Sequence, residues 1–72
     1  MKLKFLIVIE KTETGFSAYP PDLGGCVATG ATQRQVENAM RKAIEFHLQG
    51  MRAERIAVPA PQSYSTYVEV SA

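Results

Sequence analysis

A short apolar run near the start of the chain, with lysines at positions 2 and 4 before it, predicts a strand over residues 2–10. One face of that strand would carry Leu3, Phe5, Ile7 and Ile9. The middle of the opposite face is also apolar, which is typical of a central strand or of one whose second face is covered. Polar residues 11–14 and Gly15 then predict a hairpin connection, and residues 15–19 predict an antiparallel returning strand.

A longer apolar stripe in the middle of the chain has helical spacing. Thr32 is a good N-cap residue, and Gln35 three positions later completes a capping-box pattern. We expect a helix that continues through Gly50 and frays near Ala53. Its buried stripe is predicted to consist of Val36, Met40, Ala43, Ile44, His47, Leu48 and Met51.

Two further strands complete the predicted fold. Residues 26–29 are suited to a short third strand, whereas Pro59 and Pro61 indicate an extended linker. A last strand over residues 64–70 would place Tyr64, Thr66, Val68 and Val70 on one face. The sequence therefore predicts an α+β fold of order βββαβ, a four-stranded mixed sheet with one helix on one face. The other sheet face would stay partly open, with Leu6, Val8 and Tyr19 on it.

Size and composition limit the function classes. With 72 residues the chain is expected to form a single domain, 1–72, whose core is thin, so a homodimer or higher homo-oligomer is a natural source of further burial. A net charge of +1 is too small for nucleic-acid binding by bulk electrostatics. The longest apolar run is too short to span a membrane, and we expect a cytoplasmic protein.

The stretch from Tyr19 to Thr32 separates the strand-like sequence from the helix, and it concentrates the turn-forming residues. It contains two of the four prolines, three of the five glycines and the single cysteine. This concentration of prolines and glycines predicts a loop of defined shape. One interpretation is a simple connector between strand and helix. The other is a recognition surface held on a rigid scaffold.

Candidate catalytic groups are sparse. His47 lies on the apolar side of the helix, and no nucleophile lies at a sequence spacing that would indicate a catalytic pair. Cys26 fits a small buried apolar residue better than a reactive thiol. Glu10, Glu37 and Glu69 fit solvated surface charge better than a metal site. Asp22 fits a turn former. We therefore expect no enzyme activity, no cofactor and no metal.

Three motifs in order carry a resemblance to a known family. They are YPPDLGGC over residues 19–26, TGAT over residues 29–32 at the helix start, and PAP over residues 59–61. With the helix between the last two, this arrangement resembles the HicB-type antitoxin domain. The chain departs from the family pattern at Gly24, where Pro is usual, at Gln35 and Val36, where Glu and Ala are frequent, and at Arg55, where a helix-ending Gly is common.

The resemblance implies a partly degraded ribonuclease-H-like fold and an antitoxin function. The partner would be a HicA-type toxin, an mRNA-cleaving protein that is neutralised when its catalytic histidine and RNA surface are covered. Longer relatives append a DNA-binding module; none is expected here, so direct DNA binding is not expected either.

The loop is the expected contact surface for the toxin, with Asp22 available to pair with a basic group on it. The expected partner-binding residues are Tyr19, Pro20, Asp22, Leu23, Gly25 and Cys26. Two alternatives stay open at this point. One is an orphan binding or assembly domain of the same fold with no toxin, and the other is a residual metal-dependent nuclease.

Overall fold

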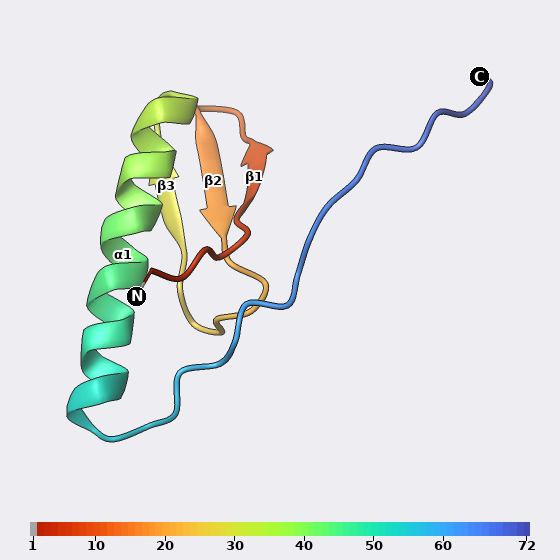
Figure 1. The fold of residues 1–72 in the computed structure, drawn as a ribbon. Coiled ribbons are helices and arrows are strands. Elements are labelled where there is room, and N and C mark those ends of the chain that lie inside the picture. Colours follow the sequence, from red (N-terminus) through yellow and green to blue (C-terminus); the bar gives the residue numbers. More distant parts are fainter. Residues whose placement is uncertain (1) are drawn as a thin grey trace.

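A computed structural model describes residues 2–72 and shows an α+β fold. Three antiparallel strands form a sheet of order β1-β2-β3, from β1 (Val8–Lys11), β2 (Phe16–Tyr19) and β3 (Ala28–Gly30). One helix, α1 (Gln33–Ala53), follows directly and covers one face of the sheet (Figure 1). The predicted hairpin, third strand and helix are thus confirmed.

The β1–β2 hairpin is shorter than the apolar pattern predicts. Its turn is closed by the amide of Thr12, which donates to the carbonyl oxygen of Gly15 at 2.8 Å. The register pairs Lys11 with Phe16 and Val8 with Tyr19. Because prolines follow Tyr19 and cannot donate to a ladder, β2 ends there, and residues 2–7 run past the end of their partner strand.

The helix begins and ends as its terminal residues dictate. The Thr32 hydroxyl accepts a hydrogen bond from the Gln35 amide at 3.1 Å, and the Gln35 side-chain oxygen accepts one from the Ala31 amide at 3.0 Å. At the other end Arg55 has a φ of 57°, and the Ile56 amide donates to the Met51 carbonyl at 2.8 Å. This is a Schellman motif with arginine at the position that glycine usually takes.

The core lies between α1 and the sheet, mainly under β2 and β3. It consists of Ala18, Cys26, Val36 and Met40, with partly buried apolar residues packed around it. Met40 and Val36 are the largest fully buried side chains, and both belong to the predicted helical stripe. Such a core is small, as expected for a chain of this length.

The predicted fourth strand does not form, so the sheet has three strands and is antiparallel rather than mixed. After α1 the chain returns to the loop that follows β2 and then extends away from the body (Figure 1). A strand needs a neighbour about 4.8 Å away. Residues 64–70 have none within the described part of the chain. The ribonuclease-H-like relationship stays a prediction.

Candidate protein-binding surface

The loop between β2 and β3 turns much of its apolar surface inward. The Leu23 amide donates to the Pro20 carbonyl at 3.1 Å, which closes a turn, and Gly25 has a φ of 76°. The Leu23 side chain is only 3% exposed, and Pro20 is also buried. Leu23 and Pro20 therefore hold the loop in shape rather than present themselves to a partner.

Asp22 joins this loop to the C-terminal segment. One carboxylate oxygen accepts hydrogen bonds from the backbone amides of Gln62 and Ser63, both at 2.9 Å. The other oxygen accepts from the Ser63 hydroxyl at 2.8 Å. The Ser63 and Gln62 amides, followed by the Ser63 hydroxyl, lower the pKa of Asp22. The carboxylate is thus already bonded within its own chain.

Cys26 lies at the end of the loop and packs into the core. Its side chain is buried beside Ala18, Val36 and Met40. Burial raises the pKa of the thiol, which favours the uncharged form. Cys26 therefore acts as a small apolar residue, in agreement with the interpretation from sequence.

Tyr19 and Gly25 are the exposed members of the predicted contact set. Tyr19 pairs with Val8 across β1 and β2. Because alternate residues of a strand point to opposite faces, burial of Ala18 against the helix places Tyr19 on the sheet face away from it. The six predicted residues all lie within positions 19–26, yet the fold does not gather them into one exposed surface.

A hollow of about 590 Å³ lies beside the loop, where the loop meets the C-terminal half of α1. Three large apolar side chains at this hollow are mostly exposed: Phe46 at 78%, Val27 at 67% and Ile56 at 50%. We define the Phe46 patch as the part of its lining formed by Val27, Phe46, His47, Met51 and Ile56.

The sequence contains a signal for this patch that the stripe analysis passed over. Phe46 is a large aromatic residue in the helix, but it does not fall on the predicted buried stripe. An aromatic side chain in that position must lie on the helix surface. Val27 gives a related signal, because it follows Cys26 in the predicted strand over residues 26–29, so burial of Cys26 directs Val27 to the opposite face.

Within residues 2–72, no three His, Cys, Asp or Glu side chains are grouped as metal ligands would be. Glu69, one of the three glutamates considered from sequence, lies in the extended C-terminal segment. In the same described range, α1 lacks the combination of length and apolar character that a membrane-spanning helix needs. The surface features that do stand out are apolar and hollowed.

Comparison with known proteins assigns the chain to a protein family. A family model described as the HicB-like antitoxin of bacterial toxin-antitoxin systems matches residues 5–71. The chain belongs to the HicB-like antitoxin family. This HicB-like chain also resembles a solved structure, the HicA3 and HicB3 toxin-antitoxin complex, with a TM-score of 0.67 and 29% identity. That match covers 82% of this chain and 72% of the other.

Two curated relatives of the HicB-like chain carry names that state no activity. A UPF0150 protein of Helicobacter pylori is 38% identical over 50 residues, which is 69% of each chain. An uncharacterised 14.9 kDa protein from the rep-hol intergenic region of Haemophilus phage HP1 is 31% identical over 62 residues. These residues are 86% of this chain and 47% of the phage protein.

Proposed function

We propose that this HicB-like chain binds a HicA-type toxin and neutralises it by covering its surface, without a chemical step. The Phe46 patch is the observation that carries this proposal. Membership of an antitoxin family and likeness to a toxin-antitoxin complex support it. The proposed mechanism needs an exposed surface with a defined shape, and the patch provides one.

The composition of the Phe46 patch suits a protein partner. Aromatic residues and methionine are enriched at protein interfaces, and large exposed apolar groups on a small domain mark interaction sites. Phe46, Met51 and Ile56 come from one continuous stretch at the end of α1 and its cap. Val27 closes the hollow from the loop side. The patch thus joins the predicted loop to the helix.

The loop residues predicted from sequence have divided roles in this proposal. Gly25 also lines the hollow, so its exposed backbone would contact the toxin. Pro20, Leu23 and Cys26 would act as a buried scaffold that fixes the loop. Asp22 would act indirectly, by holding Gln62 and Ser63 against the loop. Tyr19 would contribute only if the toxin also reached the open sheet face.

A matched pair of helix variants tests the proposal. Phe46→Ala should weaken toxin binding at least tenfold, about 1.4 kcal/mol, because it removes the central aromatic side chain of the patch. Lys42→Ala lies one turn earlier, is exposed and does not line this hollow, so it should leave affinity unchanged. Affinity is measured by calorimetry with the purified toxin, and circular dichroism checks the fold.

Equal affinity for Phe46→Ala and the parent would show that the toxin binds elsewhere. If the parent chain itself binds no HicA-type toxin, the antitoxin proposal fails. The orphan binding domain of the same fold would then be the better description.

A further inference from the structure

The C-terminal segment has the pattern of a strand but lacks a neighbour. Tyr64, Thr66, Val68 and Val70 alternate with other residues, and each is exposed. The segment is extended and leads away from the sheet and helix (Figure 1). An alternating apolar strand left in solvent is unfavourable, because its apolar face and its backbone groups both lack partners within residues 2–72.

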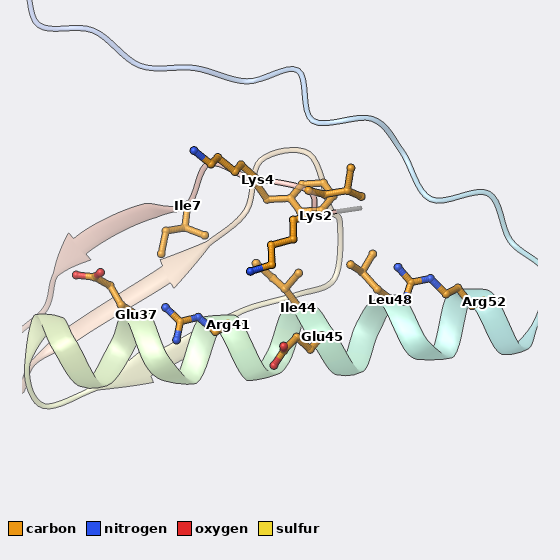
Figure 2. A pocket seen from close by; sticks show the side chains of 11 residues that line it. Lys2, Lys4, Ile7, Glu37, Arg41, Ile44, Glu45, Leu48 and Arg52 are labelled. Carbon is orange, nitrogen blue, oxygen red and sulfur yellow. The ribbon is translucent and has the colours of Figure 1, made fainter.

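A groove of about 700 Å³ has room for such a strand. It lies between α1 and the chain that leads into β1, and its apolar side chains include Phe5, Ile7, Ile44 and Leu48. Figure 2 shows Ile7 on the strand side of the opening, and Ile44 and Leu48 along α1 on the other side. β1 is the edge strand next to this groove. Within the described residues, no strand pairs with its outer edge.

The charges at the groove suit the segment. Lys2, Lys4, Arg41 and Arg52 line it, together with Glu37 and Glu45, which gives an excess of basic groups. The only charged side chain from Tyr64 to Ala72 is Glu69. An extended segment with a single negative charge therefore meets a mildly positive rim.

Length and attachment also fit. Asp22 holds Gln62 and Ser63 against the loop, so the free part of the segment starts at Tyr64. Seven residues, 64–70, span about 23 Å as a strand at about 3.3 Å per residue. The stretch from residue 5 to residue 11 has the same number of residues. The segment can therefore cover the whole unpaired edge.

We propose that each copy of this chain places residues 64–70 in the groove of a second copy, as a fourth strand beside β1. The segment leaves its own body beyond Asp22, so its own groove is not where it is directed (Figure 1). In a two-fold dimer both grooves are filled by the same exchange. Val68 and Val70 then cover Ile44 and Leu48, and backbone pairing satisfies the edge of β1.

The first test compares two charge-matched variants. The double substitution Val68→Lys with Val70→Lys places two charges on the apolar face, and Ser65→Lys with Ser71→Lys places two on the other face. Light scattering after size exclusion should give a dimer for the parent and the serine variant at tens of micromolar. The valine variant should be a monomer. A monomeric parent, or a dimeric valine variant, would overturn the proposal.

A second test distinguishes exchange from folding back within one chain. A Cys26→Ala chain that carries both Ile44→Cys and Val68→Cys is exposed to a mild oxidant. Exchange predicts a covalent dimer on a non-reducing gel. A monomer whose two cysteines are joined to each other would show insertion into its own groove. That result, or two cysteines that remain free, would contradict the proposal.

Discussion

Gly30 occupies the point where β3 meets the first turn of α1, and a side chain has no room there. A Cβ atom at this position would lie 2.6 Å from the backbone nitrogen of Val36. Since that neighbour is backbone, it cannot rotate away as a flexible side chain could. Gly30 therefore lets the strand pass directly against the helix that supplies Val36 and Met40 to the core.

Gly30→Ala should destabilise the fold by about 1–3 kcal/mol, because strand and helix must separate to admit the methyl group. Gly24→Ala is the matched control, since no atom outside the immediate neighbours lies within 4 Å of its Cβ position. Its effect should stay within about 0.5 kcal/mol. Urea unfolding measures both. Equal stability of the two variants would refute the close-contact explanation.

Asp22 gives a pH-dependent attachment of the C-terminal segment. Hydrogen bonds to the carboxylate lower its pKa in the folded chain relative to the unfolded chain. The contact is thus complete above the unfolded pKa, about 3.9, and is lost as the pH falls through the lower folded pKa. At neutral pH the segment should be held.

Asp22→Asn should loosen Gln62 and Ser63 at neutral pH, because the neutral amide is a weaker acceptor with one oxygen instead of two. Backbone ¹⁵N relaxation of the two residues measures this loosening as a fall in order parameter. Glu13→Gln, an exposed acid in the β1–β2 turn, is the control and should leave both residues unchanged. Unaltered order parameters in Asp22→Asn would mean that the carboxylate does not hold the segment.

At the scale of elements, α1 is fixed by its two ends as well as by its buried stripe. Thr32→Ala removes the acceptor of the Gln35 amide and should cost about 1 kcal/mol. Arg55→Gly should stabilise the protein by up to about 1 kcal/mol, because glycine adopts the positive φ without steric cost. The midpoint temperature of thermal unfolding should fall for Thr32→Ala and rise for Arg55→Gly. A fall in stability for Arg55→Gly would contradict the Schellman assignment.

Local signals made the helix predictable from sequence, since the capping residues and the apolar stripe lie close together along the chain. The hairpin was predictable for the same reason, because its turn ends at Gly15. The length of β1 was harder to predict from sequence. β1 is short because its partner β2 ends at the prolines, and the residues of β1 themselves contain no sign of that limit. The prediction of a fourth strand was wrong for the same reason. Apolar alternation indicates that a segment can form a strand, but it does not show that a neighbouring strand is present.

The candidate surface was predictable only in part. The turn residues correctly located a loop of defined shape, but residue type alone could not tell which side chains point inward. Leu23 is buried, and Asp22 bonds to residues forty positions later, a contact that no local pattern contains. Phe46 carried a signal in its position off the helical stripe. Its place beside Val27 depends on how the loop packs against the helix.

At the scale of the whole molecule, the chain is more extended than its length requires. Its radius of gyration is 14.0 Å, whereas a compact domain of this size has about 11 Å. The C-terminal segment accounts for the difference in shape (Figure 1). In the proposed exchange, this extended segment would fill the groove of a second copy of the chain.

The hollow at the Phe46 patch and the groove beside β1 share no lining residue, and they lie on opposite flanks of the buried stripe of α1. Self-assembly and toxin binding should therefore be separable. The Val68→Lys, Val70→Lys double variant should bind toxin with unchanged affinity per chain, within about threefold, while losing its dimeric state. Calorimetry with the toxin measures this affinity. Loss of binding together with loss of the dimer would show that one interface depends on the other.

The most direct test of the antitoxin account is co-expression of this chain with a HicA-type toxin. Complex formation is measured by pull-down and light scattering, and neutralisation by growth of the host. We predict a stable complex that relieves growth arrest, with relief reduced by Phe46→Ala and retained by Lys42→Ala. A HicA-type toxin that does not bind this chain, and whose growth arrest this chain does not relieve, would contradict the account.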